Sequence, residues 1–253
     1  MKTLLYDIEN IGILGWTFGP TYEAQILHIE HYPHLLTVAW KWLDDKQIHV
    51  LGLDDFKDYK KDRCNDLGLT KHVWNLFNEA DVVIGHNSKS FDDKMMGARF
   101  LHHRLGPPAP FKQLDTKQLA KRHARLTSNS LDNIGDFMGT GRKLKHGDFE
   151  EFWLGSHNGD PKQLKLMKKY NKIDVKRLEE WYLELRPYIE NHPSLAVFEG
   201  RPSACRNCGS ENIRTGMKYR ATNTNLYQYF KCMDCGANLK SRLPEKNEKP
   251  LYV

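Results

Sequence analysis

The chain has 253 residues, of which 40% are hydrophobic and 11% aromatic, so it can bury a sizeable core. No stretch approaches the roughly 18 uninterrupted apolar residues that a membrane span requires, and Asp7 and Glu9 come too early to leave room for a secretory signal. These features argue against a membrane or secreted protein and predict a cytoplasmic one.

The net charge of +6 is concentrated near the C-terminus. Residues 201–253 contain ten Lys and Arg against four Asp and Glu, whereas residues 1–200 contain 28 of each. A second basic stretch, residues 112–146, has only three acids, and its basic residues are Lys112, Lys117, Lys121, Arg122, Arg125, Arg142, Lys143 and Lys145. Positive charge in two places favours a polyanionic partner. Solvated helix faces explain either stretch equally well when it is taken alone.

The first third of the chain predicts three strands and a helix. Residues 3–9 form an apolar run that ends in acids, and residues 35–42 and 47–53 are rich in β-branched and aromatic residues, which predicts a hairpin beside the first strand. Residues 11–34, between the first and second of these strands, lack a clear hydrophobic period and predict a loop with one short strand at Ala24–Ile29. A helix is expected over residues 70–80, with Thr70 as its N-cap.

Strands and helices then alternate. Residues 80–87 predict a buried strand, and the following helix is expected to have Ser90 as its N-cap and Phe91 in the core. Residues 111–124 predict a short strand that runs into a helix, and Ser130 is expected to cap the next helix.

A glycine-dotted loop is expected over residues 139–160, before a long helix over residues 161–186 that begins at the Asp160–Pro161 pair. This order of elements predicts an α/β fold with a mixed sheet covered by helices.

Five residues carry the strongest chemical signal: Asp7, Glu9, Asp92, Tyr170 and Asp174. Residues i and i+2 of a strand share a face, as do residues i and i+4 of a helix, so each of the pairs 7/9 and 170/174 would project together. Hydrolysis of phosphodiesters by two metals needs several carboxylates gathered from distant parts of a fold. Surface carboxylates are the common alternative, but acids at the end of an apolar strand are costly without a cation.

The motifs DIE, N-x3-F-D (Asn87 to Asp92) and Y-x3-D resemble those of the DEDD exonuclease superfamily. They are most similar to its tyrosine-type branch, which includes the proofreading domain of family B DNA polymerases, and to phage-encoded predicted exonucleases. The likeness spans about residues 3–187. It implies an RNase H-like fold, location in the host cytoplasm if the chain is phage-encoded, and a 3′→5′ exonuclease that releases 5′-mononucleotides.

The resemblance also implies roles for the motif residues. Asp7, Glu9, Asp92 and Asp174 would hold two Mg²⁺ or Mn²⁺ ions, with Asp7 bridging both and Tyr170 orienting the attacking water. The family usually has Thr or Ser where this chain has Asn10. The expected substrate contacts are Asn10, Ile11, Ile13, Asn87, Lys143 and Lys145, and His146 is a further candidate to reach the substrate.

DNA is favoured over RNA as the substrate, with single-stranded ends, and a DNA polymerase or another replication protein is the expected partner, in phage replication, proofreading or end processing. Two alternatives remain. One is an RNA 3′ exonuclease or a structure-specific endonuclease on the same fold. The other is a non-catalytic adaptor that binds nucleic acid or a partner protein.

Four of the five cysteines form two CxxC pairs, Cys205/Cys208 and Cys232/Cys235, separated by 23 residues. This spacing is typical of a structural zinc site with four thiolates, and residues 218–232 alternate as in a hairpin, so we expect a small zinc ribbon. Its basic and aromatic surface could bind single-stranded nucleic acid or dock a protein. Cys64 is interpreted as a free thiol without a role, and the twelve histidines show no ligand pattern.

A chain of this length can hold a catalytic domain of about 200 residues and a small appendage. We expect an exonuclease domain at residues 1–192, a linker at 193–202, the zinc ribbon at 203–243 and a charged tail at 244–253.

Overall fold

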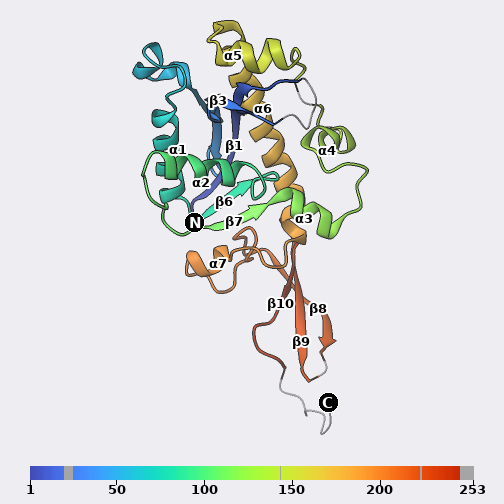
Figure 1. Cartoon of the computed structure of the whole chain (residues 1–253). Helices are drawn as coiled ribbons and strands as arrows, with labels where there is room; N and C mark the ends of the chain where they lie inside the picture. Colours follow the sequence, from blue (N-terminus) through green and yellow to red (C-terminus); the bar gives the residue numbers. More distant parts are fainter. Residues whose placement is uncertain (20–24, 143, 223, 246–253) are drawn as a thin grey trace. The chain divides into compact units, whose positions relative to one another are not determined.

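The computed structural model describes residues 1–19, 25–142, 144–222 and 224–245. The chain divides into two compact units, residues 2–181 and residues 182–253 together with Met1 (Figure 1). Each unit is described separately below.

The first unit is built on a five-stranded mixed sheet with the order β5-β4-β1-β6-β7. β1 is antiparallel to β4 and parallel to β6, β4 is antiparallel to β5, and β6 is parallel to β7. The strands are β1 (Thr3–Ile11), β4 (His34–Trp42), β5 (His49–Gly52), β6 (Val82–Gly85) and β7 (Lys112–Asp115). The predicted mixed sheet is therefore confirmed, including the hairpin of β4 and β5.

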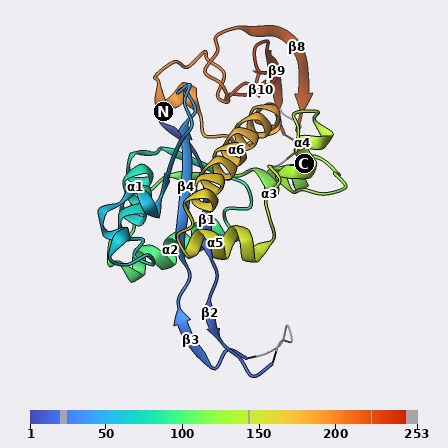
Figure 2. The ribbon, with the colours of Figure 1, turned by 90° about the horizontal axis from the view of Figure 1, so that it is seen from above.

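Helices cover both faces of this sheet (Figures 1 and 2). α1 (Leu67–Glu79) and α2 (Asp92–His102) lie on one face and α6 (Pro161–Leu185) lies on the other. The remaining longer helices are α3 (Thr116–His123) and α4 (Leu131–Phe137).

Alternation along β1 sends successive side chains to opposite faces. Tyr6 faces α1, where its ring meets Phe77 edge-on at 5.0 Å between centroids. Asp7 faces α6, where it contacts Asn171. The core strand thus delivers alternate residues to the hydrophobic core and to α6, the helix that carries the third motif, Y-x3-D.

Two helix starts differ from the prediction. α1 begins at Leu67 and its N-cap is Asp66, so Thr70 is a buried residue of the first turns and not the cap. Glycine lowers helix propensity, so the sequence placed the start of this helix after Gly68. Gly68 is nevertheless required within the first turn, because a Cβ at this position would collide with the ring of Phe56.

α2 begins at Asp92 with Phe91 at the N-cap, so Ser90 is not the cap. Phe91 is 68% exposed and does not belong to the core, contrary to expectation. The capping role of Ser130 is confirmed, because its hydroxyl accepts the N–H of Asn133 at 3.2 Å. Asp160 similarly accepts the N–H of Lys162 at 2.8 Å at the start of α6.

The segment expected to be mostly loop contains two paired strands instead of one. β2 (Leu14–Trp16) and β3 (His28–His31) are antiparallel, and they continue from β1 and towards β4 (Figure 2). The expected strand at Ala24–Ile29 is therefore shifted towards the C-terminus, and Ala24 itself lies outside the described residues. Pairing between two short segments is a tertiary preference that neither segment shows alone.

The predicted loop over residues 139–160 also contains regular structure. A π-helical turn, η3 (Glu150–Leu154), runs directly into the short helix α5 (Gly155–His157). Phe152 is buried in this turn and packs on Tyr170 of α6, with ring centroids 5.6 Å apart. Packing of this ring explains why the segment folds despite its glycines. Two 3₁₀ turns, η1 (Leu53–Asp55) and η2 (Lys57–Lys60), precede α1.

The second unit contains a three-stranded antiparallel sheet with the order β10-β9-β8. Its strands are β8 (Ile213–Ala221), β9 (Leu226–Cys232) and β10 (Asn238–Lys240), which confirms the predicted hairpin. Before them lie the 3₁₀ turn η4 (Arg186–Tyr188) and the short helix α7 (Leu195–Phe198), the latter within the expected linker.

None of the helices in the described ranges combines the length and apolar character needed to cross a bilayer.

Candidate functional site

Three carboxylates from distant parts of the chain converge in the first unit. Asp7 and Glu9 project from β1 and Asp174 projects from α6, and one oxygen of each lies within 4.8 Å of the others. Asp174 is only 2% exposed, whereas Asp7 and Glu9 are partly exposed. The period of two along β1 and the packing of α6 on the same face bring these acids together.

A β-bulge lies beside the acids. Glu9 is opposite Thr37, but Asn10 is opposite Leu35, so β4 carries one extra residue, Leu36. Bulges increase the local twist of a strand pair and re-aim the side chains next to them. The bulge therefore bends the ladder at the point where β1 presents Glu9.

Asn171 fixes the orientation of Asp7 and was not singled out from the sequence. Its amide Nδ2 donates to Asp7 Oδ2 at 2.6 Å, and its Oδ1 accepts from the hydroxyl of Thr37 at 3.1 Å. Asn171 is buried, and it links β1, β4 and α6. A polar residue in a helix rich in polar residues carries no visible signal, although its place directly after Tyr170 puts it in the motif.

Asp92, the first residue of α2, lies next to β1 but is not one of the three converging acids. Its carboxyl group lies near the backbone N–H of Ile8, the residue between Asp7 and Glu9, and this donor opposes the rise of its pKa. Burial, together with the charges of Asp93 and Asp115, raises the pKa of Asp92 to about 6.

The adjacent Asp93 has different partners. It accepts hydrogen bonds from the hydroxyl of Tyr6 and from the amide of Gln113. Burial raises its pKa as well. Both acids therefore lie against β1, but Asp93 is engaged by the side chain of Tyr6, whereas Asp92 lies at the backbone between Asp7 and Glu9.

Tyr170 lies one helical turn before Asp174 within an aromatic group. Its ring is 5.6 Å from that of Phe152 and 5.3 Å from that of His146, and His146 stacks on Phe152 at 4.3 Å. Tyr170 is mostly buried, while His146 is exposed. The imidazole of His146 thus lies on the solvent side of this group.

The expected substrate contacts have mixed surroundings. Asn10 is half-buried and its side chain donates to the carbonyl of Ile11 at 3.2 Å. Ile11 is buried, whereas Ile13 is exposed.

On the neighbouring strand end, Asn87 has a positive φ of 64°, and its N–H donates to Asp115 at 3.0 Å. Asp115 also caps α3 by accepting the N–H groups of Lys117 and Gln118, so it has a structural role. Lys145 is exposed, and Lys143 lies outside the described residues.

The acidic group fits a hard divalent cation. Carboxylate oxygens are the ligands that Mg²⁺ and Mn²⁺ prefer. Three carboxylates this close repel one another, and a cation relieves that repulsion. The residues present can therefore hold the metal ions that the sequence motifs imply.

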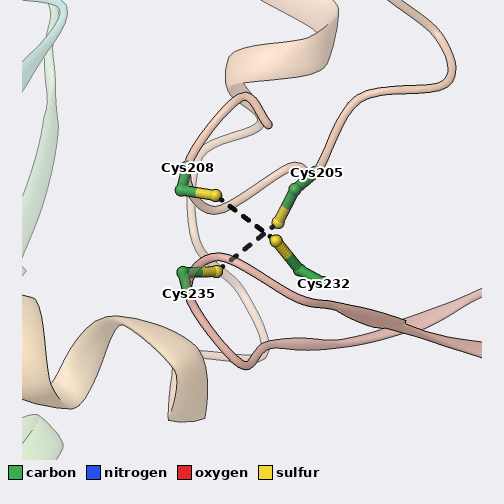
Figure 3. A group of neighbouring side chains, drawn as sticks. All are labelled: Cys205, Cys208, Cys232 and Cys235. Atoms are coloured by element: carbon green, nitrogen blue, oxygen red, sulfur yellow. Dashed lines mark hydrogen bonds between the residues drawn. The ribbon is translucent and has the colours of Figure 1, made fainter. Parts of the chain in front are cut away.

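The second unit contains the four paired cysteines, and Figure 3 shows their sulfur atoms pointing towards a common centre. The Sγ atoms of Cys205 and Cys235 are 3.8 Å apart, and those of Cys208 and Cys232 are 3.6 Å apart. Zn–S bonds of about 2.3 Å in a tetrahedron place sulfur atoms about 3.8 Å apart, whereas a disulfide would bring them to about 2.05 Å. The geometry matches a closed site with four thiolate ligands.

The loops around these cysteines have the turns expected of zinc knuckles. Gly209 and Gly236, which follow the two pairs, have φ angles of 75° and 79°, a region that favours glycine. Burial opposes ionisation of Cys232, but N–H donors from Cys235 and Asp234 bring the pKa of its thiol down to about 7. The thiol of Cys232 therefore ionises more readily than a free cysteine.

One family model matches more than half of the chain. Residues 29–186 match the family model described as the RNase_H superfamily, a range that includes Asp92 and Asp174 but not the acids of β1. A search of curated proteins returned no match. Among solved structures, the family B DNA polymerase of the hyperthermophilic archaeon Pyrobaculum calidifontis is similar, with 18% identity and a TM-score of 0.49, over 74% of this chain and 25% of the polymerase. This chain thus spans about a quarter of that polymerase.

Proposed function

Since the chain belongs to the RNase H superfamily, we propose that it is a metal-dependent nuclease, and specifically a 3′→5′ exonuclease that releases 5′-mononucleotides. The observation that carries the proposal is the convergence of Asp7, Glu9 and Asp174, with one oxygen of each within 4.8 Å of the others. When bound, two Mg²⁺ or Mn²⁺ ions would lower the pKa of a water nucleophile and stabilise both oxygens of an in-line displacement.

The side chains around the acids have separate tasks in this proposal. Asp7, Glu9, Asp92 and Asp174 hold the metal ions, and Asn171 keeps Asp7 in one orientation through its 2.6 Å hydrogen bond. Four carboxylates supply the negative charge that two divalent ions require.

Tyr170 orients the attacking water with its hydroxyl. A phenol with a pKa near 10 is a poor base at neutral pH, so the hydroxyl positions the water and does not deprotonate it. Its ring is supported by Phe152, which fixes the direction of the hydroxyl. The exposed His146, whose ring is 5.3 Å from that of Tyr170, is a candidate to contact the phosphate or base of a bound nucleotide.

Asp92, and not the adjacent Asp93, is the metal ligand in this proposal because the two residues have different partners. Asp92 lies near the backbone N–H of Ile8, between the two acids of β1, whereas the carboxylate of Asp93 is engaged by Tyr6 and Gln113. The two residues are adjacent and chemically identical, so they form a matched pair for mutagenesis.

The four-cysteine site holds one structural Zn²⁺ in a zinc ribbon, in our proposal. All four ligand positions are thiolates, so no position stays open for catalysis. On the ribbon surface Lys240 lies over the ring of Tyr227 at 4.4 Å and Arg220 over that of Tyr229 at 5.8 Å. Such basic and aromatic pairs suit the backbone and bases of single-stranded DNA.

The proposal is tested with single-stranded DNA, duplex DNA and RNA that carry a label at the 5′ end, each with Mg²⁺, Mn²⁺ or EDTA. A ladder that shortens from the 3′ end with metal, and vanishes with EDTA, is expected on single-stranded DNA. Preferential shortening of RNA would identify an RNA exonuclease, and internal cuts would identify an endonuclease. Binding of nucleic acid without cleavage, with any metal, would support the non-catalytic adaptor.

Asp92→Asn and Asp93→Asn serve as the matched variants in the same assay. Asp92→Asn should lose cleavage because it removes a metal ligand, whereas Asp93→Asn keeps a side chain that can bond to Tyr6 and should remain active. The opposite ranking would contradict the assignment of Asp92 while leaving the exonuclease activity itself established.

A further inference from the structure

A second cluster of metal-ligand side chains lies in the first unit, outside the acidic group. One ligand atom each from His34, Cys64 and His157 lie within 4.8 Å of one another. A fourth residue adjoins Cys64: Nδ1 of His31 is 3.6 Å from its sulfur. The four residues come from β3, β4, the loop before α1 and the end of α5.

His34 is prepared as a ligand by its surroundings. It is 2% exposed, and its Nδ1 lies 3.1 Å from the carbonyl oxygen of Tyr32. A carbonyl only accepts, so Nδ1 carries the proton and Nε2 carries the lone pair. Among the described residues Nε2 has no hydrogen-bond partner although it is buried. Histidines that bind metals typically donate their other ring N–H to a carbonyl in this way.

The other two histidines, His157 and His31, are close neighbours of this pair. Nδ1 of His157 is also buried without a hydrogen-bond partner in the described part of the chain. Ring centroids of His34 and His157 are 5.3 Å apart, and those of His31 and His157 are 5.8 Å apart. In a tetrahedral zinc site, bonds of about 2.3 Å to sulfur and 2.0–2.1 Å to nitrogen place these atoms about 3.6 Å apart. The contact between His31 and Cys64 has this length.

The backbone around the cluster is held by a buried ion pair. Asp66 binds the guanidinium of Arg99 at 2.6 and 2.8 Å and accepts the N–H of Leu35 at 3.0 Å. Arg99 also donates to the carbonyl of Pro33 at 3.0 Å. The residues on both sides of His34 are therefore fixed, and so is the loop that carries Cys64.

The end of α5, which carries His157, is hydrogen-bonded to the loop that carries Cys64. The guanidinium of Arg63, the neighbour of Cys64, donates to the carbonyl of Asn158, the neighbour of His157. The scaffold thus orders Cys64 and His157 against each other through their neighbours, which is the preorganisation that a metal site needs.

We propose that Cys64, His34, His157 and His31 form a second zinc site, with one thiolate and three imidazoles. Sulfur and imidazole ligands select a borderline-soft ion such as Zn²⁺ over Mg²⁺, which prefers oxygen. Four protein ligands leave no open position, so this site is structural. It ties the end of β3 and the start of β4 to the loop before α1 and to the helix that follows η3.

The test measures zinc by mass spectrometry in the full-length protein, purified without chelators and dialysed against metal-free buffer. Cys64→Ser should contain one zinc per chain fewer than the wild type. The matched control is His28→Gln, an exposed histidine three residues before His31 on β3, which should keep the wild-type content. Because the comparison is a difference, it holds whether or not the four-cysteine site is filled, and it is independent of nuclease activity.

Cobalt substitution provides the second measurement. Wild-type protein loaded with Co²⁺ should show tetrahedral d–d bands, and their intensity should fall in His157→Gln, whose partly exposed position tolerates the change better than that of His34. Equal zinc in wild type and Cys64→Ser, or identical cobalt spectra in wild type and a folded His157→Gln, would overturn the proposal.

Discussion

Replacing Asn171 with leucine removes the amide that holds Asp7 and keeps a side chain of similar size. A hydrogen bond to a charged acceptor contributes about 1.5–3 kcal/mol, which corresponds to a factor of about 10 to 150 in rate or affinity. Loss of a residue that orients a metal ligand typically costs about 10- to 100-fold in metal affinity or activity. We therefore expect Asn171→Leu to cleave 10- to 100-fold more slowly at limiting Mg²⁺, and higher Mg²⁺ to restore part of the rate.

The same substitution leaves the buried hydroxyl of Thr37 without the acceptor it has in the wild type. An unsatisfied buried hydroxyl costs about 1–3 kcal/mol of the free energy of unfolding. A second change, Thr37→Val, removes this hydroxyl, so the double variant should regain stability without regaining activity. Comparison of the single and double variants thereby separates the effect of Asn171 on stability from its effect on catalysis.

The assay is single-turnover cleavage of 5′-labelled single-stranded DNA as a function of Mg²⁺ concentration, with thermal unfolding measured alongside. A folded Asn171→Leu protein with wild-type rate and metal affinity would refute the role assigned to Asn171. Recovery of cleavage in the double variant would show instead that the single change acts only through packing.

Four further results are expected. Asp174→Asn should abolish cleavage, and its unfolding temperature without metal should hold or rise because carboxylate repulsion is relieved; cleavage near the wild-type rate would remove Asp174 from the ligand set. Tyr170→Phe should lower the single-turnover rate by about 10²–10³-fold, the usual loss for one positioned donor; an unchanged rate would leave Tyr170 a packing role. Changing Lys218 and Arg220 of β8 to glutamine should reduce the log–log salt slope of binding to single-stranded DNA by about 1.4 if each contacts one phosphate, whereas an identical slope would favour protein docking by the ribbon. Burial and the charges of Arg186 and Arg206 lower the pKa of His192 to about 4, so the folded protein favours the neutral imidazole. The free energy of unfolding should therefore be unaffected by His192 above pH about 6.5 and should fall by up to about 3 kcal/mol as the pH is lowered towards 4. In denaturant titrations across this range, His192→Gln should be less acid-sensitive than the wild type, and equal sensitivity would contradict the assignment.

Local patterns predicted the elements that present the acids. Asp7 and Glu9 lie at a spacing of two on a strand, and Tyr170 and Asp174 at a spacing of four on a helix, so simple geometry anticipated which side chains share a face. The Asp–Pro pair before α6 fixed the start of that helix. In each case the information lies within a few neighbouring residues.

Other features depend on contacts between segments that are distant in the sequence. The role of Asn171 requires knowing that Asp7 and Thr37 lie across from it. In the second cluster only His31 and His34 share a short spacing, H-x2-H, and the partners that would give this pair a meaning, Cys64 and His157, come from distant segments. The start of α1 was misjudged because Gly68 is chosen for the ring of Phe56 and not for helix propensity.

The π-turn η3 makes the length of its segment matter more than its composition. In a regular α-helix, residues five positions apart point about 140° away from each other. The π-turn η3 closes a hydrogen bond at this spacing, from the N–H of Gly155 to the carbonyl of Glu150, and so sets the rotation between Phe152 within the turn and His157 after it. Loss or gain of a single codon in this segment would swing one of them away, either Phe152 from Tyr170 or His157 from Cys64. We expect homologous chains to vary in sequence across residues 150–157 while insertions and deletions there are rejected.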